Sequence, residues 1–204
     1  VEFEWLERWR MADSEWREMH PATTDLDRRH LIEAIWKASA GDALVLGASR
    51  LIREADVWAP NQQVQVFSNR GLAGIDGTIA TATGVAIGLS GSGIGSASVT
   101  TRALMGDVTF AHDVSSLAVD PKDPPLNLQI IVGNDHGGSI FESLEPAQQL
   151  DAESFDRLFR TPQQVDFWSL AQAYGWQHIL VESSAQFDDA LATRGRVIIE
   201  VKLA

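Results

Sequence analysis

Residues 130–141 read IIVGNDHGGSIF, an apolar run that ends in an amide, an acid, a histidine and two glycines. A continuous apolar run of this length is typical of a strand buried on both faces of a sheet. Asn134, Asp135, Gly137 and Gly138 then follow at the point where the buried strand leaves the core. Ligands of open parallel sheets bind just beyond this end of the strands. The stretch therefore predicts both a fold class and the position of a site.

The rest of the chain repeats the same alternation of apolar runs and helical patterns. We predict strands in ALVLGAS (43–49), at 64–69, 98–107 and 128–134, and in QHILVES and RVIIEV, with helices near 2–19, 25–39, 50–57, 77–88 and 110–118. Strands that alternate with helices form parallel sheets, because a parallel crossover places its helix on a face of the sheet. We therefore expect an α/β fold with three layers, α/β/α, around a parallel sheet of about six strands.

Composition excludes several classes of protein. The 204 residues carry a net charge of −12, and no run rich in lysine or arginine offers a surface for nucleic acid or an anionic membrane. The chain has no cysteine, which rules out disulfides, thiolate nucleophiles and zinc–thiolate sites. No uninterrupted apolar 18-mer or signal peptide is present, so we expect a cytoplasmic protein that does not insert into membranes.

The two ends of the sequence suggest a domain cut from a longer polypeptide. The chain starts inside a helical pattern that carries Trp5, Trp9 and Trp16 at helical spacing, and it stops directly after an apolar strand. We expect residues 1–204 to form a single domain, in which residues 1–24 are an N-terminal helix and linker from the preceding domain. The tryptophan stripe is expected to pack against another part of the protein.

Two acids follow neighbouring predicted strands. Asp107 and Asp135 lie 28 positions apart, which is the length of one strand–helix–strand unit. The two side chains can therefore end adjacent strand tips and face one ion. Mg²⁺ is usually held by one or two carboxylates together with phosphate oxygens of a ligand. Glycines at 106, 137 and 138 would let the backbone approach a diphosphate and donate N–H groups to it.

These motifs resemble those of the thiamine-diphosphate enzymes, which carry Gly-Asp-Gly, one strand–helix–strand spacer and then Asn-Asn. Here the first motif departs at Val108 and the second at Asp135. Three ordered stretches are similar to the branch of the family that serves menaquinone biosynthesis: SNRGLAGIDG (68–77), GD-x-T (106–109) and ND-x-GG-x-IF (134–141). The resemblance is strong over residues 45–141 and looser elsewhere.

The resemblance implies thiamine diphosphate and Mg²⁺ (or Mn²⁺) as cofactors. It assigns the metal to Asp107, Asp135 and the carbonyl of Gly137, and makes Ile75 the residue that bends the cofactor. The implied cofactor-binding residues are Ile75, Gly106, Asp107, Val108, Thr109, Asn134, Asp135, Gly137, Gly138 and Ile140. His136 lies between the metal ligands at a position where the family tolerates varied side chains, so we give it no role.

The resemblance also implies the reaction, a decarboxylation of 2-oxoglutarate followed by transfer of the succinyl unit to isochorismate. Ser49, Arg53 and Arg70 would meet substrate carboxylates, with Arg50 as the alternative to Arg53, and Phe141 would wall the reaction space. The glutamate that activates the cofactor comes from the N-terminal domain of a partner subunit. We therefore assign no catalytic residue to this chain, and expect a homo-oligomer and negligible turnover by this part alone.

Two other interpretations remain open. The chain could belong to another thiamine-diphosphate decarboxylase or carboligase, such as one similar to acetolactate synthase. It could also be a non-catalytic diphosphate- or nucleotide-binding module. A dinucleotide-binding fold needs several glycines after its first strand, whereas VLGASRLIRE supplies one.

Overall fold

The core of the protein is a six-stranded sheet in which every neighbouring pair of strands is parallel. The computed structural model describes residues 2–21, 24–91 and 99–203. The strands are β1 (Ala43–Leu46), β2 (Gln65–Phe67), β3 (Thr101–Gly106), β4 (Leu128–Asn134), β5 (Gln177–Val181) and β6 (Arg196–Lys202), in the order β2-β1-β3-β4-β6-β5. The predicted six-stranded parallel sheet is confirmed.

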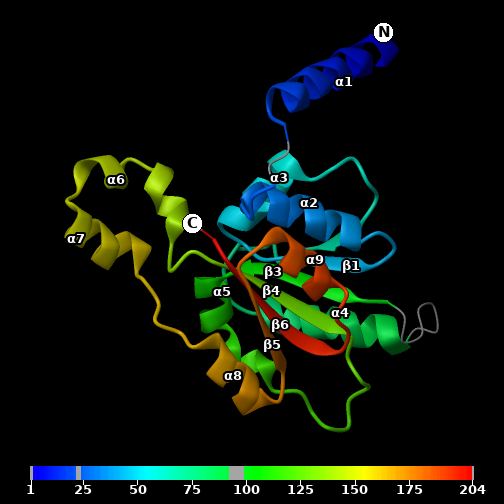
Figure 1. Cartoon of the computed structure of the whole chain (residues 1–204), viewed down its shortest axis with the longest axis vertical. Coiled ribbons are helices and arrows are strands. Elements are labelled where there is room, and N and C mark those ends of the chain that lie inside the picture. Colours follow the sequence, from blue (N-terminus) through cyan, green and yellow to red (C-terminus); the bar gives the residue numbers. More distant parts are fainter. Residues whose placement is uncertain (1, 22–23, 92–98, 204) are drawn as a thin grey trace.

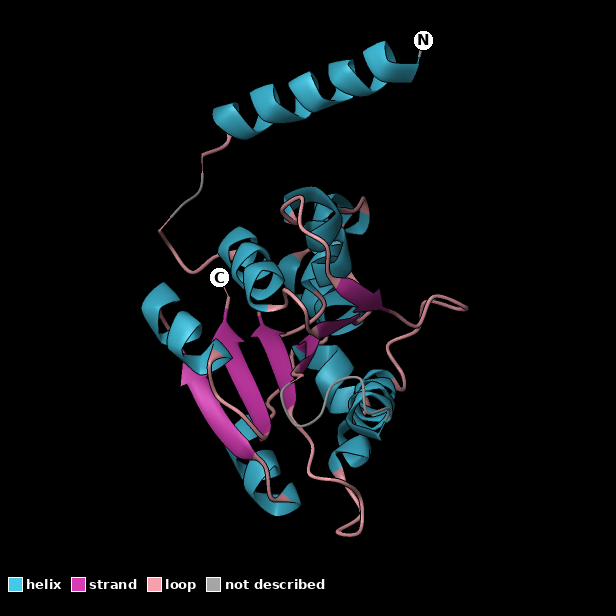
Figure 2. Ribbon diagram, turned by 90° about the vertical axis from the view of Figure 1, so that its right-hand side faces the viewer, coloured by secondary structure: helices cyan, strands magenta, loops and turns pink. Residues whose placement is uncertain are grey.

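Helices cover both faces of this sheet, which makes three layers (Figures 1 and 2). One face carries α2 (Arg28–Ala38), α3 (Arg50–Trp58) and α9 (Ser184–Leu191). The other face carries α4 (Thr78–Gly91), α5 (Asp107–His112), the 3-10 turn η2 (Val114–Leu117) and α8 (Phe167–Tyr174). The predicted α/β/α architecture is therefore confirmed.

Alternate residues of each central strand enter opposite halves of the core. On β3, Leu104 packs toward the α2, α3 and α9 layer, whereas Ala103 and Met105 pack toward the α4, α5 and α8 layer. On β4, Ile131 and Val132 divide in the same way. All seven residues of β4 are buried, which explains why this strand reads as one continuous apolar run.

Two parts of the chain lie outside the layers. Helix α1 (Glu2–Met19) stands apart from the α/β body in both views, and its last turn contacts the body, where the ring of Trp16 lies 4.9 Å from that of Trp58. Trp5 and Trp9 are exposed. After β4 the chain leaves the body through η3 (Ser139–Ser143), α6 (Pro146–Gln149), α7 (Ala152–Phe155) and the π-helical turn η4 (Asp156–Arg160). Within the described residues, no helix combines the length and apolar character needed to cross a membrane.

Several predicted boundaries shift for local reasons. Helix α2 begins three residues later than expected, because the side chain of Asp27 accepts the His30 N–H and caps it there. Strand β2 pairs over only three residues, since it is a partly exposed edge strand. Asp107 opens α5 instead of ending β3, so the predicted helix near 110–118 is an α-helical turn followed by a 3-10 turn. In the glycine-rich stretch 88–96, residues 88–91 end α4, and 92–96 lie outside the described residues.

Candidate functional site

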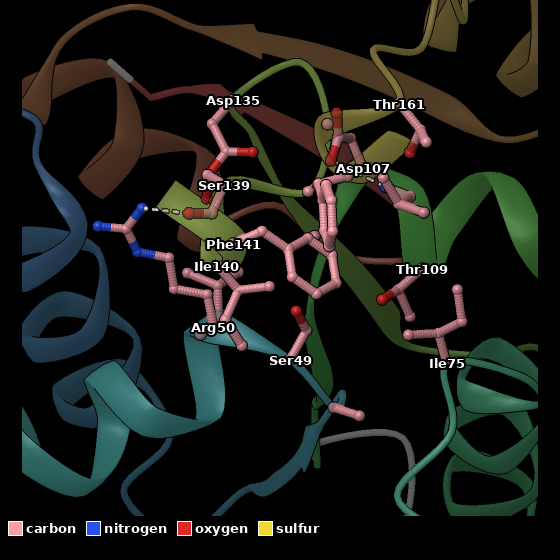
Figure 3. Close-up of a pocket in the computed structure, with 18 residues that line it drawn as sticks. Ser49, Arg50, Ile75, Asp107, Thr109, Asp135, Ser139, Ile140, Phe141 and Thr161 are labelled. Carbon is pink, nitrogen blue, oxygen red and sulfur yellow. Dashed lines mark hydrogen bonds between the residues drawn. The ribbon is translucent and has the colours of Figure 1, made fainter. Parts of the chain in front are cut away.

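A pocket opens at the carboxyl ends of β1, β3 and β4. From β1 the chain moves to β2 on one side and returns to β3 on the other, which creates a switch point where ligands of such sheets bind. The pocket has a volume of about 190 Å³ (Figure 3). It is lined by Ala48, Ser49, Arg50, Leu51, Ile75, Gly106, Asp107, Val108, Thr109, Gly133, Asp135, Gly137, Gly138, Ser139, Ile140, Phe141, Phe159 and Thr161.

Asp107 and Asp135 lie at the same end of this pocket (Figure 3). Burial raises the pKa of Asp107 from 3.8 to about 6; the Val108 N–H opposes this increase, and the negative charge of Asp135 adds to it. The two carboxylates are therefore close enough to repel each other. A cation between them would remove this repulsion.

The carboxylate of Asp107 is only half satisfied. Its Oδ1 accepts the Val108 N–H at 2.8 Å, whereas its Oδ2 is buried and no described residue donates to it with hydrogen-bond geometry; the nearby Gly137 N–H still lowers the pKa of this carboxyl. A buried carboxylate oxygen without a partner is costly. A divalent cation would satisfy this oxygen, so the observed donor set fits a metal ion.

Asp135 is oriented by two neighbours. Arg28, the first residue of α2, donates to its Oδ2 at 2.7 Å, and the hydroxyl of Ser139 donates to the same oxygen. In Figure 3 the other oxygen of Asp135 is directed toward the side of the pocket that Asp107 occupies. The described residues contain no group of three or more acidic or histidine side chains that could hold a metal by themselves. Two carboxylates fit Mg²⁺, which takes its remaining ligands from water and phosphate.

The loop after β4 is held tightly. The Gly138 N–H donates to the Arg160 carbonyl at 2.7 Å, and Gly137 has a φ of 138°. A Cβ at Gly137 would lie 2.4 Å from that carbonyl oxygen, so this close approach of two chain segments requires glycine. The hydrogen bond between Gly138 and Arg160 joins the two ends of the segment 138–160. It places Phe159 and Thr161 at the pocket wall.

Backbone strain gathers around the pocket. Four described residues other than glycine have a positive φ, and three of them, Ser49, His136 and Thr161, lie at the pocket or in the loop that borders it. Such conformations are uncommon and cluster at functional sites. The strain therefore marks the same place as the carboxylates.

Eleven of the residues predicted for the site line this pocket: Ser49, Ile75, Gly106, Asp107, Val108, Thr109, Asp135, Gly137, Gly138, Ile140 and Phe141. Asn134, Arg53 and Arg70 do not line it. The amide of Asn134 instead donates to Glu200 at 2.7 Å, and its Oδ1 accepts the His136 N–H, so this side chain braces the loop from behind.

The arginines divide between two places. Arg50 lines the main pocket. Arg53 is exposed and donates to the Ser49 carbonyl at 2.6 Å; together with Arg70 it lines a separate shallow depression. The sequence left open whether Arg50 or Arg53 serves the site, and in this structure Arg50 is the one at the pocket.

Sequence reasoning missed Arg28, Ser139, Phe159 and Thr161. Ser139 lies inside the quoted motif and could have been considered as a partner of Asp135. Arg28 lies 107 positions from Asp135, and Phe159 and Thr161 return only after a long excursion. No local pattern carries these long-range contacts.

Comparison with known proteins identifies the family of this chain. Residues 52–201 match the family model described as thiamine pyrophosphate enzyme, C-terminal TPP binding domain. The chain belongs to this family of thiamine pyrophosphate enzymes. The match includes β3, β4 and the loops that carry both aspartates of the pocket.

Relatives within the thiamine pyrophosphate enzymes point to one branch. The chain is 47% identical over 190 residues to the 2-succinyl-5-enolpyruvyl-6-hydroxy-3-cyclohexene-1-carboxylate synthase of Clavibacter michiganensis subsp. michiganensis, covering 91% of this chain and 32% of that protein. It is 43% identical over 201 residues to the synthase of the same name from Nocardioides sp., covering 93% of this chain and 36% of the relative. The chain thus spans about a third of the length of these relatives.

Solved structures of thiamine pyrophosphate enzymes share the fold at low identity. Benzoylformate decarboxylase from Polynucleobacter necessarius superposes with a TM-score of 0.70 at 20% identity, over 86% of this chain and 33% of that one. The thiamine diphosphate-dependent 4-hydroxybenzoylformate decarboxylase of Rhodococcus jostii RHA1 superposes with a TM-score of 0.67 at 18% identity, over 90% and 33%. At this identity the likeness supports the fold alone.

Proposed function

We propose that this chain is the cofactor-binding domain of a 2-succinyl-5-enolpyruvyl-6-hydroxy-3-cyclohexene-1-carboxylate synthase of menaquinone biosynthesis. The observation that carries the proposal is the pair of carboxylates, Asp107 and Asp135, at neighbouring strand tips of a glycine-lined pocket. Relatives that bear this name are 40–47% identical to this chain over 82–98% of its length. An acetolactate-synthase-like activity remains the alternative for the test below.

In this proposal the acidic end of the pocket holds Mg²⁺ and thiamine diphosphate. Asp107, Asp135 and the carbonyl of Gly137 would bind the metal, whose remaining positions would take diphosphate oxygens. The backbone of Gly106 and Gly138 would lie along the diphosphate. When bound, thiamine diphosphate supplies the carbanion chemistry that removes CO₂ from a 2-oxo acid and transfers the remaining unit.

The other walls of the pocket would position the reactants. Ile75 would bend the cofactor, while Ile140 and Phe141 would limit the space around the reacting carbon. Asn134 would act by bracing the loop that carries Asp135. The exposed Arg53 and Arg70, or Arg50 at the pocket, would meet the carboxylates of 2-oxoglutarate and isochorismate.

The proposed site is completed by parts outside this chain. A volume of about 190 Å³ is below the roughly 300–1,000 Å³ of ordinary small-molecule sites. We propose that an N-terminal domain of a partner subunit covers the pocket and brings the activating glutamate, so the active protein is a homo-oligomer. We also propose that it is cytoplasmic. Residues 1–24 would form the helix and linker that lead in from the preceding domain.

The proposal is tested with the complete protein, thiamine diphosphate and Mg²⁺. The protein should release CO₂ from 2-oxoglutarate and form the succinylated product when isochorismate is added. Pyruvate is the matched 2-oxo acid that lacks the second carboxylate. Turnover of pyruvate in preference to 2-oxoglutarate would favour the acetolactate-synthase-like alternative, and turnover of neither would contradict both.

A further inference from the structure

Arg28 forms a long-range ion pair with the second carboxylate of the pocket. Its guanidinium donates to Asp135 Oδ2 at 2.7 Å, across 107 positions of sequence. Both side chains are largely removed from solvent, with 16% and 13% of their surfaces exposed. Salt screens a partly buried ion pair only weakly. The positive charge of Arg28 therefore acts strongly on neighbouring groups.

The position of Arg28 on its helix is unfavourable for a cation. It is the first residue of α2 and directly follows the capping carboxylate of Asp27, while the first turn itself contains no acidic residue. The positive end of the helix dipole lies there and disfavours a further positive charge. The hydrogen bond to Asp135 places this positive charge beside the pocket.

Arg28 also changes the charge balance of the pocket. Asp107 and Asp135 repel each other, and the proposed ligand carries a diphosphate that both would repel. Two carboxylates and one Mg²⁺ sum to zero, and Arg28, which pairs with Asp135, adds a positive charge at the end of the pocket that holds both aspartates. Arg28 engages Oδ2 of Asp135, which leaves Oδ1 for the cation.

We propose that Arg28 is a positioning residue that fixes the Asp135 carboxylate and supplies the positive charge needed for a diphosphate-bearing ligand. The inference rests on the proposed function, because that function identifies the ligand. Arg28 comes from the segment just after residue 24, so it links the N-terminal part of the chain to the metal-binding end of the pocket.

The test measures the dissociation constant of thiamine diphosphate at saturating Mg²⁺ for the complete protein. Arg28→Gln should raise this dissociation constant about tenfold. That is the lower limit of the usual effect of losing a residue that hydrogen-bonds to a metal ligand. The double variant Arg28→Gln/Asp135→Asn restores the original charge balance and retains an oxygen ligand. Its dissociation constant should return to within about threefold of the parent value.

Arg29→Gln is the matched control, because the neighbouring Arg29 pairs with Glu33 and does not line the pocket. Its dissociation constant should match that of the parent. Thermal unfolding without ligand, recorded for each variant, separates a folding defect from a binding defect. If Arg28→Gln does not fold, recovery of folding and binding in the double variant supports the inference.

Three results for the variants would overturn the inference. Arg28→Gln could bind within twofold of the parent, the double variant could bind no better than Arg28→Gln, or Arg29→Gln could weaken binding equally. A parent protein that binds no thiamine diphosphate with Mg²⁺ would overturn the proposed function and the inference with it. The result for the parent thus distinguishes the two failures.

Discussion

Gly106 and Gly133 are register partners on the neighbouring parallel strands β3 and β4. Asp107 directly follows Gly106, and Asp135 lies two residues after Gly133. A Cβ atom at Gly133 would lie 2.9 Å from the Leu203 side chain and 3.0 Å from that of Leu51, so these core side chains pack directly against the backbone of β4. This register is what brings both carboxylates to one end of the pocket.

The first prediction concerns Asp107→Asn. Asparagine has the same shape as aspartate but lacks the charge that binds a cation. The affinity for Mn²⁺ in the presence of thiamine diphosphate should therefore fall by more than the ~10–100-fold that is typical of losing a group that hydrogen-bonds to a metal ligand. Calorimetric titration measures this change, and turnover should be lost with it. Without metal the variant should be at least as stable as the parent, since a buried charge has been removed.

His136→Ala is the control for Asp107→Asn. His136 lies in the same loop as Asp135 but is exposed and does not line the pocket. It should retain most of the activity and of the metal affinity. Equal losses in both variants would mean that the metal role assigned to Asp107 is wrong.

The second prediction follows from the pKa of Asp107, which burial raises from 3.8 to about 6. Between about pH 4 and 6 the folded protein retains a proton that the unfolded chain releases. The free energy of unfolding of the metal-free protein should therefore decrease as pH rises through this window, by at most about 3 kcal/mol from this group. Denaturant unfolding in a chelator at pH 4 and 7 measures the decrease.

Asp107→Asn separates this effect from that of other titrating groups. The variant has no carboxyl group at position 107 to ionise. Its free energy of unfolding should therefore change less between the two pH values than that of the parent. An identical change in both proteins would show that Asp107 does not cause the pH dependence. Added Mg²⁺ should reduce the decrease in the parent, because the cation stabilises the ionised carboxylate.

The third prediction concerns Gly137→Ala. The new Cβ would lie 2.4 Å from the Arg160 carbonyl oxygen, and the backbone would keep a φ of 138° that alanine rarely adopts. We expect a loss of at least ~2 kcal/mol in the free energy of unfolding, because strain and overpacking add. Gly84→Ala is the control: it lies in α4, its Cβ would meet nothing within 4 Å, and it should stabilise the protein by up to ~1 kcal/mol. Equal stability of the two variants would contradict the close approach of the two segments.

The sheet and the two carboxylates could be predicted because both follow from local sequence. The apolar run before Asn134 fixes a buried strand, and the 28 positions between Asp107 and Asp135 fix one crossover. The inward position of Arg28 and the return of Phe159 to the pocket could not be predicted, because they depend on tertiary packing across long separations. Asn134 shows the same limit: its position was predicted correctly at the strand end, but its side chain bonds to Glu200 on β6 and not to the pocket.

The last prediction separates the two arginines that the sequence could not distinguish. Arg50 lines the pocket and pairs with Glu54 at 3.1 Å, whereas Arg53 is exposed and donates to the Ser49 carbonyl at 2.6 Å. Because Arg50 lines the pocket, Arg50→Gln should raise the KM for 2-oxoglutarate about tenfold in the complete protein, since a charged hydrogen bond contributes roughly 1.5–3 kcal/mol. Arg53→Gln should change that KM less than threefold. Steady-state kinetics with 2-oxoglutarate, and then with isochorismate, measures both values. A larger effect of Arg53→Gln would show that the substrate carboxylate binds in the depression shared by Arg53 and Arg70.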